Sequence, residues 1–183
     1  LDAPDLQLMF GPFAFGMSPE GVVPYRKPAV TSVIALSYPK STGRISLRAN
    51  DPDTPLRIEH RLLDHPDDVA ALVRGIRIVR EVYKQPAIAR YVIDERLPGT
   101  GVDSDADLEA YVRATSNPTN HPMGGCAMGK VVGADLRVTG VEGLRVADAS
   151  IMPRHVSGNI NACVLMIGER ASDLIRADAA PSK

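Results

Sequence analysis

The sequence predicts a mixed α/β (α+β) protein in which an antiparallel sheet packs against amphipathic helices. Residues 31–38 (TSVIALSY) are apolar and rich in β-branched side chains, which favours a strand. Residues 44–48 (RISLR) alternate polar and apolar side chains, as half-exposed strands do. Apolar residues recur at helical spacing between positions 69 and 79, and an apolar run at 162–167 opens a final helix. Strands and helices therefore follow each other in blocks along the chain.

The first 60 residues are predicted to carry the strands. A short strand at 5–10 leads into a loop that contains Phe10, Phe13 and Phe15. We expect these rings to pack against the domain's own core, because apolar clusters are usually buried; the alternative is a flap near a substrate pocket. Residues 31–38 and 44–48 are expected to pair as an antiparallel hairpin through the turn that ends at Gly43. Residues 56–58 are expected to add a short extended piece.

Helices are predicted for most of the remainder. The first opens at His65, with Asp67 and Asp68 in its first turn, where the helix dipole favours acidic side chains. The last begins fully buried, since its first turns are apolar all round, with Asn159 or Asn161 as the capping residue. The expected helices span residues 66–84, 87–92, 107–115 and 162–177, and Asp103, Ser104 and Asp105 are expected to cap the third. Residues 144–147 are expected to form a strand that ends at Asp148.

Composition excludes several classes of function. The 183 residues carry a formal net charge of −1 and no Trp, which argues against a basic or base-stacking surface for nucleic acid. No apolar run approaches the roughly 20 residues that a membrane span needs. Cys126 and Cys163 lack the spacing of metal ligands or of a disulfide framework. The chain begins at Leu1, which we interpret as a processed chain or a piece of a longer one; its compartment is not fixed, with a soluble cytoplasmic location favoured.

The candidate chemistry lies between residues 121 and 161. The His121 imidazole can be neutral near pH 7 and can accept a proton from a hydroxyl group, although by composition alone it is an ordinary histidine. The Asn159 amide can donate a hydrogen bond to a developing alkoxide. Asp148 follows a predicted strand, where ligands gather in α/β sheets, but a lone acid at this place is more often a turn cap.

Two further residues in this region are interpreted as structural. Cys126 lies among Gly124, Gly125 and Gly129, whose lack of a side chain allows a tight turn or a close backbone approach, and no partner arrangement for nucleophilic work surrounds it. His155 is interpreted as a polar neighbour in a Pro-Arg-His turn.

Three motifs in this region resemble the C-terminal part of the glucose–methanol–choline (GMC) family of flavin oxidoreductases. They occur in the family's order: His121-Pro122 with GGCAMG, then GLRVADASIMP at 143–153, then GNINA at 158–162 with MIGER at 166–170. The turn at 39–43, the loop at 50–55 and the helix after His65 also resemble the family's substrate-binding domain. The resemblance thus covers essentially the whole chain.

The resemblance implies roles for these residues. It places His121 close to the flavin N5, where it assists removal of the hydroxyl proton, and Asn159 at the second position, with Asn as in the choline-oxidising branch. It places Asp148 and Ala149 against the ribityl-diphosphate part of FAD. It directs the N-terminus of the last helix, with Asn159, Ile160 and Asn161, at the flavin C2 carbonyl. The catalytic candidates are therefore His121 and Asn159, and no metal is expected.

The implied organisation is a substrate-binding domain at 1–130, followed at 131–183 by the return strand and helix of a Rossmann-like FAD domain that is otherwise missing. No strand–Gly-x-Gly-x-x-Gly–helix fingerprint occurs in the sequence, so FAD is expected to need an N-terminal FAD-binding segment or a second chain. The implied activity is oxidation of a small-molecule alcohol to a carbonyl. A non-redox cyanohydrin lyase of the same family and a non-catalytic binding remnant of the fold are the alternatives.

Overall fold

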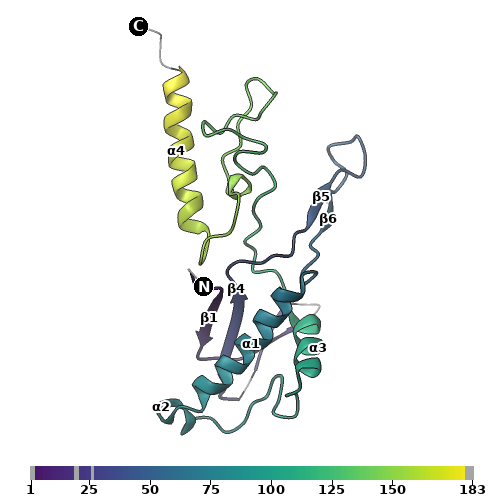
Figure 1. Cartoon of the computed structure of the whole chain (residues 1–183), viewed down its shortest axis with the longest axis vertical. Coiled ribbons are helices and arrows are strands. Elements are labelled where there is room, and N and C mark those ends of the chain that lie inside the picture. Colours follow the sequence, from purple (N-terminus) through teal and green to yellow (C-terminus); the bar gives the residue numbers. More distant parts are fainter. Residues whose placement is uncertain (1–2, 19–20, 26, 180–183) are drawn as a thin grey trace. The chain divides into compact units, whose positions relative to one another are not determined.

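A computed structural model describes residues 3–18, 21–25 and 27–179 (Figure 1). The chain splits into two compact units: a first unit of Leu1–Thr42 with Arg61–Asn117, and a second unit of Gly43–His60 with Pro118–Lys183. The mixed helix and antiparallel-sheet class is confirmed. The elements are β1 (Leu6–Gly11), β2 (Phe15–Ser18), β3 (Gly21–Pro24), β4 (Thr31–Leu36), β5 (Arg44–Ser46), β6 (Arg57–Glu59), α1 (Pro66–Tyr83), α2 (Pro86–Ala89), α3 (Asp105–Thr115), the 3-10 turn η1 (Ala149–Ile151) and α4 (Asn161–Ala179).

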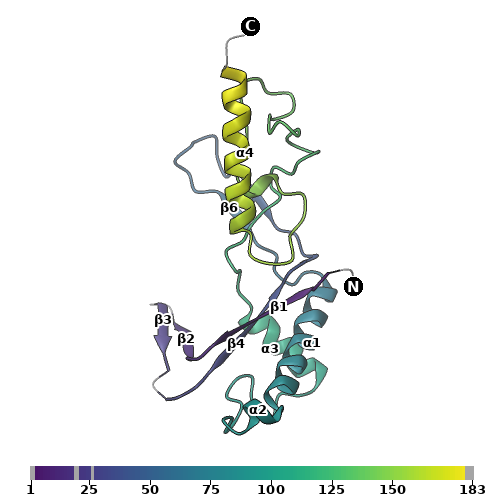
Figure 2. The same ribbon diagram turned by 90° about the vertical axis from the view of Figure 1, so that its left-hand side faces the viewer.

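The first unit is built on an antiparallel pair of strands. β1 pairs with β4, so that Leu6 lies opposite Leu36 and Gly11 lies opposite Thr31. The chain between them forms a second antiparallel pair, β2 with β3. Figure 2 shows this second pair leading out from the end of the β1–β4 ribbon and back into it. The predicted strands at 5–10 and 31–38 are confirmed.

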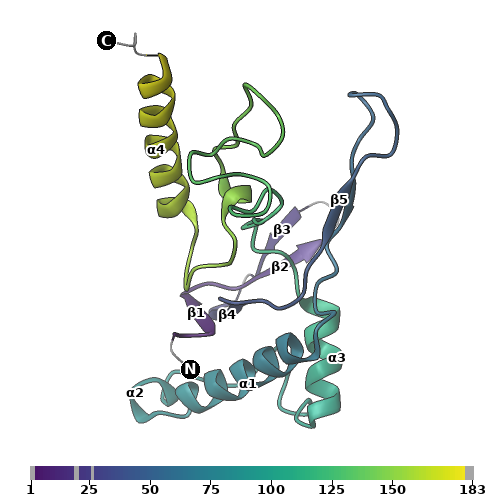
Figure 3. The same ribbon diagram turned by 45° about the horizontal axis from the view of Figure 1, so that its top comes forward.

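Helices α1 and α3 bury the apolar side of this unit. α1 passes so close to β4 that a Cβ atom added at Gly75 would lie 2.7 Å from Ile34 Cγ2. α3 crosses α1 (Figure 3), and Leu108 of α3 is fully buried between them. Both predicted helix starts are confirmed: His65 Nδ1 accepts the Asp67 N–H of α1, and Ser104 Oγ accepts the Asp107 N–H of α3. The buried cluster comprises Leu63, Val69, Leu72, Ile76, Leu108 and Val112.

The predicted hairpin between residues 31–38 and 44–48 is wrong. β4 pairs with β1, and β5 pairs antiparallel with β6, so that Ile45 lies opposite Ile58. The reason is Asp68, whose buried carboxylate accepts the backbone N–H groups of Lys40 and Ser41 and holds this segment at the start of α1.

Gly43 is needed for a close backbone approach and not for a turn. A Cβ atom at Gly43 would lie 2.4 Å from the carbonyl oxygen of Glu59. Only a residue without a side chain can therefore lead into β5 at this position.

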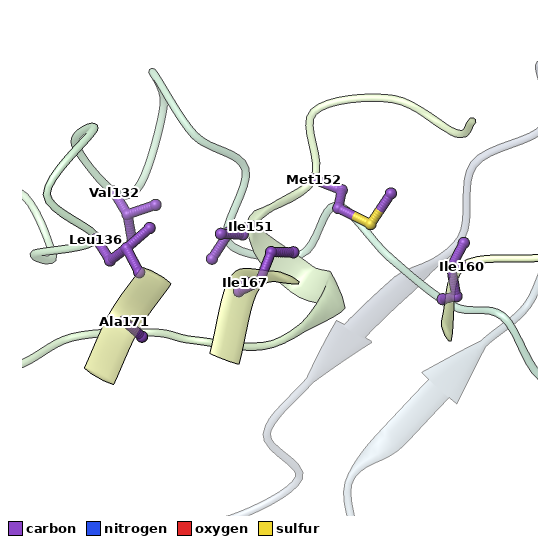
Figure 4. Packing of buried hydrophobic residues seen from close by; sticks show 7 residues of the cluster. All are labelled: Val132, Leu136, Ile151, Met152, Ile160, Ile167 and Ala171. Carbon is purple, nitrogen blue, oxygen red and sulfur yellow. The ribbon is translucent and has the colours of Figure 1, made fainter. Parts of the chain in front are cut away.

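The second unit is organised around one buried face of α4. Figure 4 shows Val132 and Leu136 over Ala171, and Ile151 beside Ile167. The cluster comprises Val132, Leu136, Ile151, Met152, Ile160, Ile167 and Ala171. The loops that supply these residues carry little regular structure. The expected strand at 144–147 is absent, because its one neighbour is the segment around Arg137, which it meets through a single isolated bridge at Arg145.

The final helix is confirmed but does not begin buried all round. Ile167 and Ala171 are buried, whereas Leu165 and Met166 are 64% and 59% exposed. The helix therefore packs through one face only. The expectation for the early loop is also wrong, because Phe10 and Phe13 are 64% and 60% exposed and do not pack into a core.

The compact units do not follow the predicted boundary at Lys130, because the second unit also includes residues 43–60 and 118–130. The assignment of 1–130 to a substrate domain and of 131–183 to a FAD domain stays a prediction. Within the described part of the chain, no helix is both long enough and apolar enough to cross a membrane.

Candidate functional site

His121 lies in an irregular segment that follows α3, and its side chain is half-buried. Neighbouring residues hold this segment against the core of the second unit. Met123 packs against the hydrophobic cluster of Figure 4. Cys126 N–H donates to the Ser150 carbonyl at 2.9 Å, and Met128 N–H donates to the Ile151 carbonyl at 2.8 Å. The backbone around the candidate base is therefore fixed to the η1 turn.

Gly124 in this segment serves a tight turn, one of the two roles that the glycine pattern predicts. It has a φ of +86°, which residues with side chains rarely adopt. A Cβ atom placed there would make an ordinary contact, at 3.5 Å, with the Met152 carbonyl oxygen, so the backbone angle and not crowding favours glycine. Cys126 is a free, half-buried thiol whose observed contact is a backbone hydrogen bond, in keeping with a structural role.

These contacts hold the two segments together over a few residues. Gly124 lies beside the Met152 carbonyl, and Cys126 and Met128 donate to the Ser150 and Ile151 carbonyls. Burial lowers the pKa of the half-buried His155 below its ordinary 6.5, and the positive charge of His121 lowers it further.

The interpretation of His155 as a polar neighbour stays a prediction. The charge of His121 acts on its imidazole, and the sequence around His155 carries no signal of that interaction.

Asp148 is an exposed residue that caps the η1 turn. Its carboxylate accepts the Ser150 N–H at 2.8 Å, which is the turn-cap role weighed against ligand binding. One carboxylate oxygen is thereby engaged. Ala149, the next residue, packs against the hydrophobic cluster.

Asn159 and Asn161 flank the buried Ile160 at the start of α4. The Ile160 carbonyl accepts the Val164 N–H, so Ile160 is the residue that precedes the helix. The expectation that an Asn side chain caps α4 is not met, because neither Asn side chain makes a hydrogen bond within the described residues. Both side chains are exposed, and their amide groups remain available to a ligand.

The start of α4 offers groups that suit an electron-rich oxygen atom of a ligand. The first turn of an α-helix presents N–H groups and a partial positive charge, which suit an oxygen atom carrying negative charge. α4 begins with exposed polar residues and is long enough, at 19 residues, to show this effect fully. The chain offers no comparable glycine-rich helix start for a pyrophosphate. Within the described residues, no group of three or more His, Cys, Asp or Glu side chains is placed to hold a metal ion.

The family model for GMC oxidoreductases matches residues 39–168, which include His121, Asp148 and Asn159. The chain belongs to the GMC oxidoreductase family. The chain is 39% identical to choline oxidase of Arthrobacter globiformis over 189 residues, a match that covers 96% of the chain and 34% of that relative. The GMC chain therefore spans about a third of the length of this relative.

Solved structures agree with this assignment. Pyridoxine 4-oxidase from "Mesorbium loti" superposes with a TM-score of 0.84 at 27% identity, covering 98% of the GMC chain and 35% of its own. A FAD-dependent oxidoreductase from Chaetomium thermophilum superposes with a TM-score of 0.77 at 28% identity, covering 86% of the GMC chain and 28% of its own. The family is thus one of flavoprotein oxidoreductases with FAD as cofactor.

Proposed function

We propose that this chain is the C-terminal portion of a FAD-dependent enzyme that oxidises a small-molecule alcohol to a carbonyl compound. Family membership supports the reaction class, and both choline and pyridoxine, named in similar proteins, are alcohols. The observation that carries the proposal is the half-buried imidazole of His121, anchored through Cys126 and Met128 to the segment that leads to the start of α4.

Two side chains, those of His121 and Asn159, act on the alcohol. His121 accepts the hydroxyl proton as the C=O bond forms. The Asn159 amide donates a hydrogen bond to the oxygen as it gains negative charge. Bound FAD would supply the acceptor for the hydride of the substrate carbon, and this hydride and the proton taken by His121 would together account for the two-electron oxidation.

The start of α4 is proposed to hold the flavin ring. Asn159, Ile160 and Asn161 would face the pyrimidine carbonyl, and Asp148 with Ala149 would lie against the ribityl-diphosphate part. One oxygen of the Asp148 carboxylate already accepts the Ser150 N–H, and the other makes no hydrogen bond within the described residues. The pyrophosphate would be held by an N-terminal FAD-binding segment or a second chain, which we propose packs on residues 131–183.

His121→Ala in the intact, flavin-loaded enzyme tests this function. We expect kcat with a saturating alcohol to fall by roughly 10²–10⁴-fold, the usual contribution of a positioned acid/base group. Flavin content should persist, because His121 is proposed to contact the substrate and the reacting end of the flavin only. His60→Ala is the matched control, since His60 is an exposed histidine of the same compact unit.

Two results would contradict the proposal. Unchanged turnover in His121→Ala at saturating substrate would remove the acid/base role. A flavin-loaded enzyme that oxidises no primary or secondary alcohol from a broad panel, while it cleaves a cyanohydrin, would place the protein in the non-redox alternative.

A further inference from the structure

The hairpin of β5 and β6 carries its apolar side chains on one face. Ile45 lies directly opposite Ile58, and the neighbouring Arg44 lies opposite Glu59. Successive side chains of a strand point to opposite faces of a sheet. Ile45 and Ile58 therefore share one face of the hairpin, and the two charged residues lie on the other.

The apolar face is open to solvent. Leu47 and Leu56 continue the alternation of Ile45 and Ile58 just beyond the strand ends. All four side chains are exposed, from 46% for Leu56 to 77% for Leu47, whereas Glu59 on the polar face is half-buried. A two-stranded hairpin is at best marginally stable in water unless its apolar face is covered. This face therefore needs a covering partner.

The hairpin presents this face as a formed surface. The backbone at Gly43, just before β5, approaches the end of β6 so closely that a Cβ atom there would meet the Glu59 carbonyl oxygen. On the polar side, the Arg57 guanidinium pairs with the Glu59 carboxylate at 2.9 Å. The two strands thus hold each other in register, and a formed, exposed apolar face marks an interface.

We propose that this apolar face, made of Ile45, Leu47, Leu56 and Ile58, is a docking surface for the FAD-binding portion of the enzyme, meaning the segment or second chain that carries the pyrophosphate site. This inference rests on the proposed function. It extends the surface that contacts the FAD-binding portion from residues 131–183 to a hairpin far away in the sequence.

Two observations identify the FAD-binding portion as the occupant. The match to choline oxidase covers 34% of that relative, so most of such a protein lies outside the matched part, and the dinucleotide fingerprint is absent from this sequence. The hairpin also belongs to the same compact unit as α4, on which Leu165 and Met166 are exposed. The unit that is proposed to receive the FAD-binding portion on α4 thus offers it a second apolar surface.

The kind of cover that the hairpin needs supports the same occupant. A hairpin of two short strands requires its cover throughout the life of the folded protein. A portion of the same enzyme supplies a permanent cover, whereas a transient partner leaves the four side chains in water. Burial of these side chains then contributes to holding the FAD-binding portion in place.

Chemical labelling of the intact, flavin-loaded enzyme tests the proposal. Ile58→Cys places a thiol on the apolar face, and Arg44→Cys is the matched control on the opposite face of the same hairpin. The rate of reaction with a maleimide is measured by mass spectrometry of the peptide that contains the new cysteine, so Cys126 and Cys163 do not interfere. In a separate variant, a benzophenone amino acid replaces Leu47, and its photo-cross-links are mapped to peptides.

We expect Ile58→Cys to react at least about tenfold more slowly than Arg44→Cys, because the reagent reaches a covered thiol only when the interface opens. The cross-links from position 47 should map to peptides of the FAD-binding portion. Neither measurement depends on the identity of the substrate. If the cross-links reach the FAD-binding portion but the enzyme oxidises no alcohol, the docking surface stands and the proposed function fails.

Three outcomes would overturn the inference. Equal labelling rates for Ile58→Cys and Arg44→Cys would show that the apolar face is open in the intact enzyme. Cross-links from position 47 to another copy of the enzyme, detected in a mixture of isotope-labelled and unlabelled protein, would show an interface between copies. Cross-links that stay within residues 1–183 would show that this chain covers its own hairpin.

Discussion

Asp68 is the residue on which the start of α1 and the segment after β4 both depend. This residue is 3% exposed, and its carboxylate accepts Lys40 N–H at 2.9 Å, Ser41 N–H at 2.8 Å and the Ser41 hydroxyl at 2.5 Å. The Ser41 oxygen in turn accepts the His65 N–H at 3.0 Å. Replacing Asp68 by Ala leaves three donors without their acceptor.

The expected loss in the free energy of unfolding follows from these three donors. An unsatisfied buried donor costs about 1–3 kcal/mol, so three would cost about 3–9 kcal/mol if they were independent and fully buried. Lys40 is exposed and water reaches this side, so we expect Asp68→Ala to lower the free energy of unfolding by about 3–4 kcal/mol. Asp68→Asn keeps one acceptor oxygen and should lose about 1–2 kcal/mol. Asp67→Ala is the control, because its carboxylate is 58% exposed and pairs with Lys40 at the surface.

The pH dependence adds a second test. Burial has the largest influence on the pKa of Asp68 and raises it, but the hydrogen bonds from Lys40 and Ser41, with the charge of His65, together lower it below 3.8. The stabilisation is therefore complete above pH 3.8 and is lost as the pH falls through the lowered folded-state pKa.

Urea unfolding followed by circular dichroism at several pH values measures these effects. The reasoning is refuted if Asp68→Ala at pH 7 is no more destabilising than Asp67→Ala. It is also refuted if the difference in the free energy of unfolding between wild type and Asp68→Asn does not become smaller below pH 3.8.

The remaining predictions concern the flavin site. Asn159→Ala should reduce turnover per bound flavin by the equivalent of roughly 2.7–4 kcal/mol, as measured by stopped-flow flavin reduction, because one donor to a developing oxyanion is lost. Normal turnover per flavin with reduced flavin content would instead make Asn159 a cofactor anchor. FAD titrated into the chain of 183 residues alone should not bind at micromolar concentration, since the chain has no glycine-rich pyrophosphate site and leaves Leu165 and Met166 exposed on α4. Stoichiometric binding near a micromolar dissociation constant, measured by fluorescence quenching, would show a self-sufficient flavin domain.

Local structure and family could be predicted from the sequence because their signals lie within short stretches. The acidic first turn after His65, the Ser104 cap and the apolar spacing of α1 act over a few residues and appear in the structure as expected. The motifs around His121 and Asn159 likewise predicted the family, and the family model confirms it.

Pairing and exposure were decided by contacts between residues far apart in the sequence. β4 pairs with β1 and not with β5. The reason is that Asp68, which lies 27 residues beyond Ser41, accepts the Ser41 N–H and holds the segment that was expected to form the turn. The apolar residues in the first turns of α4 do not indicate that one face of the helix is exposed, because burial depends on which loops pack against each face. The charge interaction between His121 and His155 likewise depends on how segments far apart in the sequence are brought near each other.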